Sequence, residues 1–255
     1  MNSQKLKQHF ELLIFYTKAK LEAESYRHFA GYLWWLLDPL IGVGIYYFLF
    51  KVIMNRGEEG FIGFLLLGLT LWKWISDSIS KSSGAILSGI GLMKRIRLQA
   101  HIFPTVEIFY NSWKFALIFL VMTVGFAISN GVSLNHLFIL PLLMTSLIFI
   151  VGVSFFLASI IPFLPDLHFI ISYSMKLLFY ASAVLYSESR VPDKYRFLID
   201  YNPIANIIKS FREIMLRLDT PSIQSIFLPL FIGLTLGSIG LVIIRNKNRE
   251  YAKLH

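Results

Sequence analysis

The sequence contains no cysteine and few charged residues. Asp, Glu, Lys and Arg make up 15% of its 255 residues, against about a quarter in a typical soluble domain. Without cysteine the chain can form no disulfide bond and has no thiolate to bind a metal ion. There is no HExxH or GxSxG pattern, and the histidines are scattered. These absences argue against a metal site and against an enzyme.

A nucleotide-binding loop is missing as well. The pattern GxxxxGK[ST] does not occur, and the chain has no Gly-Lys pair. A chain without this loop cannot hold the phosphates of ATP in that way. We therefore expect no cofactor of its own and no hydrolysis of ATP by this chain.

Long apolar stretches dominate what is present. Hydrophobic residues make up 56% of the chain and aromatic residues 16%. A helix of about 20 apolar residues, rising ~1.5 Å per residue, crosses ~30 Å of hydrocarbon. The sequence therefore predicts an all-α membrane protein with six transmembrane helices. The six stretches are residues 31–54, 61–87, 105–129, 134–161, 167–186 and 223–244.

The charges predict the orientation of these spans. Six spans place both ends of the chain on one side, and residues 1–30, 88–104 and 245–255 on that side hold more Lys and Arg than residues 51–60 and 187–222 opposite. The positive-inside rule therefore predicts that both termini are cytoplasmic. The net charge of +9 then reflects attraction to anionic lipid headgroups, and no nucleic acid is expected as a partner.

Two segments outside the spans have helical patterns. Before span one, charged residues share one face of an amphipathic helix expected to lie in the membrane interface. Between spans five and six, apolar residues recur at helical spacing after Asn202 and Pro203, a good helix start. This second segment is either a helix half-immersed at the outer surface or a re-entrant pair with residues 193–199. A re-entrant pair must be covered by protein or line a cavity, so the segment is a candidate gate.

Charged residues inside the spans should face protein or water, because each costs ~2.5–3.5 kcal/mol at the centre of the membrane. Lys73, Asp77 and Lys81 fall on one face of span two, and Glu107 and Lys114 share a face of span three. Matching their depths predicts two pairs between the spans, Lys81 with Glu107 and Asp77 with Lys114. The alternative is that these charges line a translocation path.

Two further polar features interrupt the apolar pattern. Lys176 lies in the middle of span five with no acid nearby in sequence, so it should face a wet lumen or a subunit interface. Between spans two and three, apolar and basic residues alternate over residues 92–98. This connection is either a short helix that docks on a partner or a basic loop that contacts lipid headgroups.

Four elements in this order resemble the membrane subunit of bacterial ABC-2 type exporters of surface polysaccharides. They are the amphipathic N-terminal helix, GYLWWLLDP at residues 31–39, the basic connection ending in FP at residues 103–104, and PDKYRFLIDYNPIANIIKSFREIM at residues 192–215. The likeness covers nearly the whole chain. Many such subunits have Arg-Asp-Leu after span four, whereas this chain has Pro165, Asp166 and Leu167, so a role of that arginine is not carried over.

The resemblance implies a permease without enzymatic activity in the bacterial inner membrane, moving lipid-linked O-antigen, capsular polysaccharide or teichoic acid. It implies a homodimer joined to two copies of a separate ATPase, which binds ATP and Mg²⁺. The permease would be one domain over residues 1–255, with an interfacial helix at 1–30, spans one to five over 31–187, an external gate at 188–222, span six at 223–244 and a cytoplasmic tail at 245–255. The ATPase-coupling residues would be Leu92, Met93, Lys94, Arg95, Arg97 and Leu98. The outer gate would include Tyr201, Asn202, Pro203 and Phe211.

The many aromatic residues suit a path for sugars. Aromatic faces pack against the C–H faces of sugar rings without fixing one pattern of hydroxyls. Aromatic belts at the membrane surface are the alternative explanation for any one of them. The candidate path residues are Trp35, Tyr46, Tyr47, Trp72, Trp74, Tyr110, Trp113, Tyr173, Lys176 and Tyr180.

Two other classes of protein are weaker alternatives. A secondary transporter would use charges within the membrane, but the halves of this sequence show no convincing repeat. A membrane-embedded transferase or hydrolase would need a convergent set of catalytic groups, which the scattered histidines do not suggest.

Overall fold

The computed structural model describes residues 3–254, apart from residues 28–30, 56–59 and 96–97. The described chain is helical and contains no strand. Among these residues, five helices are long and apolar enough to cross a membrane. The predicted all-α, multi-pass membrane fold is confirmed at this level. The five are α2 with its π-helical continuation (Leu33–Ile53), α3 (Phe61–Ser83), α5 (Ile102–Asn130), α6 with the turn before it (Leu134–Ile160), and α10 (Ile223–Tyr251).

The remaining predicted span is shorter than its apolar pattern suggested. Helix α7 covers Leu167–Ala181, which is 15 residues, or roughly 22 Å of helix. The prediction placed its end at residue 186. The chain leaves the helix after Ala181, and Ala183 adopts the left-handed conformation with φ of 51°. Residues 182–186 are still apolar or small, so the pattern gave no sign of this end.

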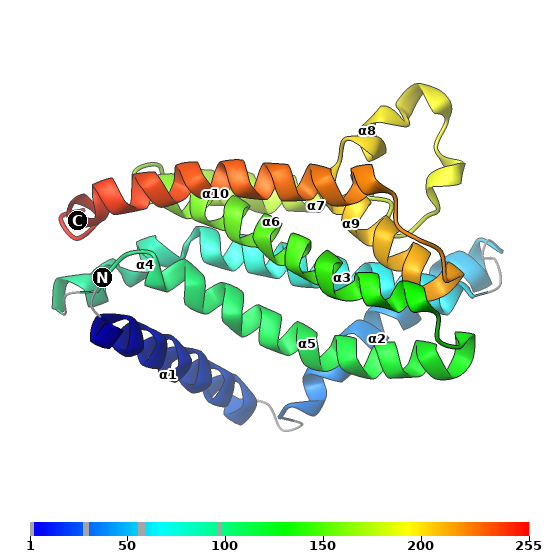
Figure 1. Ribbon diagram of the computed structural model, residues 1–255, viewed down its shortest axis with the longest axis horizontal. Coiled ribbons are helices and arrows are strands. Elements are labelled where there is room, and N and C mark those ends of the chain that lie inside the picture. Colours follow the sequence, from blue (N-terminus) through cyan, green and yellow to red (C-terminus); the bar gives the residue numbers. More distant parts are fainter. Residues whose placement is uncertain (1–2, 28–30, 56–59, 96–97, 255) are drawn as a thin grey trace.

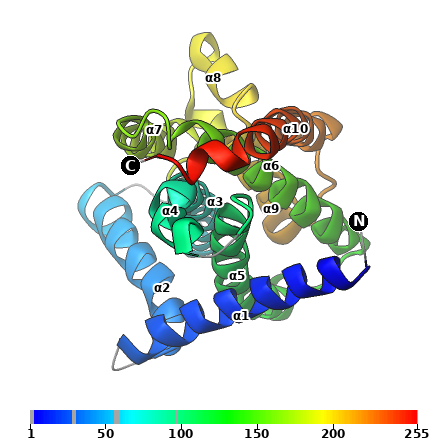
Figure 2. The same cartoon turned by 90° about the vertical axis from the view of Figure 1, so that its left-hand side faces the viewer.

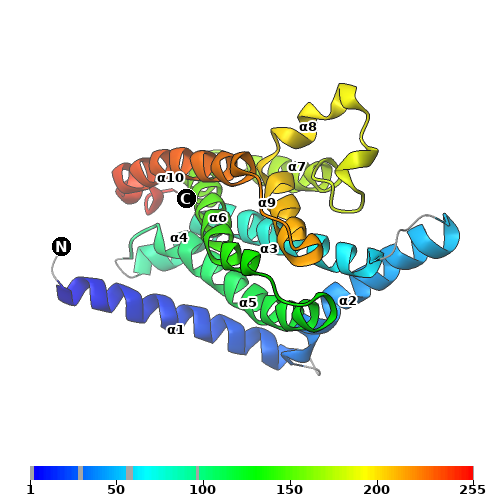
Figure 3. The same cartoon turned by 45° about the vertical axis from the view of Figure 1, so that its right-hand side comes forward.

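The long helices run back and forth along one bundle (Figure 1). Both chain ends lie at one end of this bundle, here called the terminal end, together with α4 (Ala85–Arg95). The other end, here called the far end, carries α8 (Phe197–Asp200) and α9 (Pro203–Arg212). Helix α1 (Ser3–Arg27) crosses the bundle and packs on α5 (Figure 2). The last turns of α2 project beyond its neighbours (Figure 3).

Helix α3 is the centre of the bundle. It contacts α2, α5, α6, α7 and α9, and Leu65, Leu67, Leu71 and Ile75 on it are fully buried. A helix that is apolar around most of its circumference is buried by its neighbours rather than by one surface. Gly84 separates α3 from α4, so the predicted span 61–87 ends at Ser83 and its last residues begin a second helix.

Helix α9 lies inside the bundle against α3 and α10. Its apolar residues are buried as expected, but Asn206, Ser210 and Arg212 on its other side are buried too. A helix half-immersed at the surface would expose that side. The surface-helix interpretation is therefore wrong for α9, because the chain supplies protein partners for its polar groups.

Helices α6 and α10 approach each other closely through glycine. A Cβ on Gly233 would lie 2.7 Å from Cα of Phe149 on α6, and a Cβ on Gly240 would lie 2.6 Å from the carbonyl carbon of Phe155. Small residues at such positions allow helix backbones to pack in a membrane, where no hydrophobic effect drives the helices together. The two helices have the most extensive contact in the bundle.

Replacing Gly233 by alanine should therefore destabilise the bundle by about 1–3 kcal/mol, because one extra methyl group forces a packed backbone apart. Thermal unfolding of the detergent-solubilised protein measures this. Gly125→Ala on α5 is the matched control, since nothing lies within 4 Å of its Cβ position. Equal melting temperatures for the two variants would contradict the close packing.

The C-terminal residues are not a free tail. Helix α10 continues to Tyr251, beyond the predicted end of span six at residue 244. The Tyr251 hydroxyl donates to the carbonyl of Ser159 at 2.9 Å, and the side-chain oxygen of Asn248 accepts from the Ala100 amide at 2.7 Å. The predicted tail at residues 245–255 is thus largely helix, because these side chains find partners on α6 and on the connection between α4 and α5.

Candidate functional site

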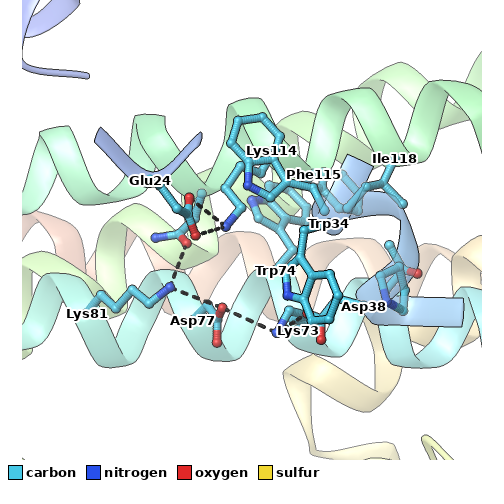
Figure 4. Close-up of a pocket in the computed structure, with 14 residues that line it drawn as sticks. Glu24, Trp34, Asp38, Lys73, Trp74, Asp77, Lys81, Lys114, Phe115 and Ile118 are labelled. Carbon is cyan, nitrogen blue, oxygen red and sulfur yellow. Dashed lines mark hydrogen bonds and ion pairs between the residues drawn. The ribbon is translucent and has the colours of Figure 1, made fainter. Parts of the chain in front are cut away.

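A charged pocket lies where α1, α2, α3 and α5 meet (Figure 4). It has a volume of about 190 Å³. Acidic, basic and aromatic side chains share its walls. Those used below are Glu24, Trp35, Asp38, Lys73, Trp74, Asp77, Lys81, Asn111, Lys114 and Phe115.

Positive and negative charges alternate along the α3 wall of this pocket. Lys73 pairs with Asp38 of α2 at 2.8 Å and lies 3.8 Å from Asp77. Lys81 pairs with Asp77 at 3.2 Å and donates to the side-chain oxygen of Asn111 at 3.4 Å (Figure 4). The spacing of four residues places the three α3 side chains on one face. Each charge therefore has a partner of opposite sign, which offsets its cost within the membrane.

Helix α1 supplies the other half of the pocket. Lys114 of α5 donates to Glu24 at 2.9 Å, and the hydroxyl of Tyr110 also donates to Glu24. Lys20, one turn earlier on α1, pairs with Glu107. Burial raises the pKa of Glu24, but the hydrogen bonds from Tyr110 and Lys114 outweigh burial and leave that pKa below its usual value. Two ion pairs thus tie α1 to α5.

The structure corrects the predicted ion pairs. Lys81 bonds to Asp77 on its own helix rather than to Glu107, and Lys114 bonds to Glu24 rather than to Asp77. The prediction matched depths on spans two and three alone. It missed that α1 reaches this depth with Lys20 and Glu24, and that α2 brings Asp38. Asp77, Lys81 and Lys114 do line the charged pocket, whereas Glu107 lines the neighbouring groove beside α1.

Three of the candidate path residues belong to this site. Trp74 stacks on Phe115 with ring centroids 4.0 Å apart, and its indole N–H donates to the Ser112 hydroxyl at 3.0 Å. The Lys114 ammonium lies 5.2 Å from the ring centroid of Trp35 and 5.1 Å from that of Tyr110. The site therefore offers flat aromatic surface together with hydrogen-bond donors and acceptors.

The other path candidates lie elsewhere. Tyr173, Lys176 and Tyr180 form an exposed face of α7, with the Lys176 ammonium 5.1 Å from the Tyr173 ring centroid. Tyr46 and Trp72 contact Phe179 of α7, with ring centroids 6.0 and 5.5 Å away. Tyr47 is half-buried on α2, and Trp113 is exposed on α5.

Among the gate candidates, Asn202 joins two helices. Its side-chain oxygen accepts from the amides of Ile204 and Ala205, so it caps α9 as predicted. Its side-chain nitrogen donates to the Ala181 carbonyl at 3.2 Å and to the Ser182 hydroxyl at 2.9 Å. Pro203 is the first residue of α9. Tyr201 is exposed, whereas Phe211 is fully buried.

Sequence reasoning missed Arg212, the main polar contact at the far end. Its guanidinium donates to the carbonyls of Ala183 and Val184 at 2.7 Å each and to that of Phe64 at 3.2 Å. Burial lowers the pKa of Arg212 to about 9. The sequence feature that accompanies this contact is Gly68, a glycine inside α3. A Cβ at Gly68 would overlap a guanidinium nitrogen of Arg212, so only glycine leaves room for the arginine. Arg212 therefore satisfies the carbonyls left free where α7 ends.

At the terminal end, the residues predicted to couple to the ATPase lie in different surroundings. Leu92 and Leu98 line a groove of about 280 Å³ with Tyr16 of α1, and Lys94 and Arg95 are exposed at the end of α4. Met93 is buried against the core instead, so the structure does not present it to a partner. Arg97 lies outside the described residues.

Comparison with known proteins finds relatives over nearly the whole chain. The sequence is 28% identical over 247 residues to the O-antigen export system permease protein RfbA of Klebsiella pneumoniae, covering 96% of this chain and 95% of that protein. It is 26% identical to the RfbA of Myxococcus xanthus, covering 98% and 97%. The chain is a homologue of polysaccharide export permeases. The family resemblance seen in the sequence is thus confirmed.

A third relative broadens the range of polymers. The polysialic acid transport protein KpsM of Escherichia coli is 27% identical over 245 residues and covers 88% of each chain. No family model matches the sequence. The relatives are transport subunits, which agrees with the expectation that this chain is not an enzyme.

Proposed function

We propose that this chain is the channel-forming permease of an ATP-driven exporter that moves lipid-linked O-antigen polysaccharide across the bacterial inner membrane. The observation that carries the proposal is its similarity to O-antigen export permeases over at least 96% of its length. The charged site with aromatic walls suits a hydroxyl-rich ligand, and the absence of a phosphate loop assigns the energy source to another subunit.

The antiparallel arrangement of the helices supports a six-span topology. Helix α7 runs opposite to α6 and α10, so it acts as a sixth span although it is short (Figure 1). The terminal end is the cytoplasmic one, α1 lies at the membrane interface, and α8 and α9 are re-entrant elements at the outer end of the bundle. Residues 1–255 form one permease domain in this arrangement.

The proposed passage for the polysaccharide requires a homodimer. The charged pocket, the α1–α4 groove and a pocket between α2 and α5 hold about 190, 280 and 380 Å³, which is the size of a small-molecule site rather than of a polymer passage. These volumes favour a passage that forms between two copies. The exposed aromatic face of α7, with Tyr173, Lys176 and Tyr180, faces this passage and provides its sugar-binding surface.

Two copies of a separate ATPase bind ATP and Mg²⁺ and dock at the terminal end. The exposed Lys94 and Arg95, with Leu92 and Leu98 in the groove beside α1, form the docking surface. Two ion pairs hold α1 against α5. A displacement of α1 by the docked ATPase therefore moves the side chains of the charged pocket.

Capsular polysaccharide is the second candidate cargo. It is favoured by the similarity to the polysialic acid transport protein and by Pro165, which stands where many subunits of the resembled family have arginine and brings the chain closer to capsule exporters. Teichoic acid is a third cargo of the same class.

The test is to express the chain with the ATPase encoded beside its gene, in a host that makes the polymer on a lipid carrier. Polymer should reach the cell surface only when both subunits are present and the ATPase is active. Surface staining and gel analysis of the polymer measure this, and they also identify the cargo.

A matched variant isolates the docking surface. Replacing Lys94 and Arg95 by glutamate should stop export while the permease stays inserted in the membrane. Lys194→Glu, at the far end, should leave export unchanged. Export without ATP hydrolysis, or without this chain, would refute the proposal.

A further inference from the structure

A second polar pocket lies at the far end of the bundle, about 270 Å³ in volume. The start of α3, the turn at residues 187–190, α9 and the π-helical segment Glu213–Arg217 enclose it. Four of its lining residues, Arg196, Lys209, Arg212 and Glu213, fall within the family-like stretch at residues 192–215. The walls used below are Phe64, Glu188, Ser189, Lys209, Glu213 and Arg217.

Hydrogen-bond donors and acceptors alternate around this pocket. Glu188 pairs with Lys209 at 2.9 Å. One carboxylate oxygen of Glu213 is buried without a hydrogen-bond partner among the described residues. Arg217 is exposed beside it. A buried acceptor without a partner is costly, so this oxygen is a candidate position for a hydroxyl, an ion or water.

The base of the pocket is rigid. The guanidinium of Arg212 lies 3.4 Å from the ring centroid of Phe64 and is fixed by three carbonyls. A rigid base keeps the wall residues in place before a ligand arrives, which reduces the entropy lost on binding.

The mixture of charges selects the ligand. The walls hold two carboxylates and four basic side chains, but Arg196 pairs with Asp193, Lys209 pairs with Glu188, and Arg212 is held by backbone carbonyls. Glu213 is then left as an acceptor and Arg217 as a donor for a ligand. A neutral ring with several hydroxyls suits both kinds of group, because each hydroxyl donates one hydrogen bond and accepts others.

We propose that this far-end pocket binds one neutral sugar ring of the exported polymer as the polymer leaves the permease. Glu213 accepts from a hydroxyl, and Arg217 and Lys209 donate to neighbouring ones. The inference rests on the proposed function for the source of the sugar, but it concerns a site separate from the charged pocket near α1.

The absence of cysteine makes a direct test possible. Ser189→Cys places a single thiol at the pocket, and Thr220→Cys places one on the exposed chain at the far end outside it. The permease–ATPase complex is reconstituted in nanodiscs and labelled with a membrane-impermeant maleimide. The probe is the oligosaccharide fraction released by mild acid from the host's own surface polysaccharide, and sodium sulfate serves as the anion control.

The oligosaccharides should slow labelling of Ser189→Cys about fivefold or more and leave Thr220→Cys unchanged. Adding Glu213→Gln and Arg217→Gln should abolish this protection, whereas Lys194→Gln on the same outer segment should keep it. ATP hydrolysis by each complex confirms that it is folded.

Three results would overturn the inference: no protection by the oligosaccharides, equal protection by sulfate, or protection that survives loss of Glu213 and Arg217. Because the assay needs no transport, it separates failure of this site from failure of the proposed function. Polymer export with an unprotected thiol would reject the site alone, and protection without export would reject the export function alone.

Discussion

Arg212→Met is expected to lower the melting temperature of the solubilised permease by about 5–20 °C, because the carbonyls of Ala183 and Val184 lose their donor. An unsatisfied buried acceptor costs ~1–3 kcal/mol, and ~1 kcal/mol shifts the melting temperature of a chain of this size by roughly 2–4 °C. Methionine keeps the length and much of the volume of the side chain. The change is therefore in hydrogen bonding to Phe64, Ala183 and Val184 rather than in packing.

Thermal unfolding followed by tryptophan fluorescence measures this effect. Lys194→Met is the control, since it removes a positive charge from an exposed side chain on the same outer segment. A melting temperature within ~2 °C of wild type for Arg212→Met would show that these carbonyls are satisfied in another way.

Reversing Glu24 to lysine is expected to reduce export about tenfold or more, in keeping with couplings of ~1–3 kcal/mol between linked sites. The new ammonium would face Lys114 and would lose the hydrogen bond from Tyr110. Helix α1 would then separate from α5, and docking of an ATPase at the terminal end would no longer move the charged site. Surface polymer, normalised to the amount of inserted permease, is the measurement.

The double variant Glu24→Lys with Lys114→Glu should recover most of this export, because it restores a pair of opposite charges at the same place. Glu22→Lys is the matched control on the same helix. Its partner Lys18 is exposed at 3.8 Å, and exposed pairs contribute ~1 kcal/mol or less. A double variant as defective as Glu24→Lys alone would mean that the pair does not act as a tether.

The sequence predicted most of the fold because hydrophobic spans are a local signal. The apolar run of α6 is long enough to cross the membrane, and this can be seen from its own residues without knowing which helices lie beside it. Asn202 and Pro203 were found as a helix start because capping depends on two or three adjacent residues. The end of α7 was missed because Arg212 and Asn202, some 20 to 30 residues away, satisfy its free carbonyls.

The charged site was found in part. The alternation of Lys73, Asp77 and Lys81 is visible in the sequence, so their common face could be predicted. The partners of Glu107 and Lys114 could not be predicted, because Lys20 and Glu24 lie before the spans and their sequence gives no sign of the depth at which α1 packs. Met93 was likewise assigned to the surface, although its neighbours on α10 and α6 bury it.

By itself the sequence determined that this protein is helical, crosses a membrane several times, and has no nucleotide-binding loop of its own. Composition, length and local patterns suffice for these conclusions, because lipid requires every spanning segment to satisfy its backbone internally. Only the tertiary structure decided which charges pair, that α9 is buried, and that the far end holds a polar pocket. These depend on side chains distant in sequence that meet across helices, and a one-dimensional pattern carries no information about which helix lies beside which.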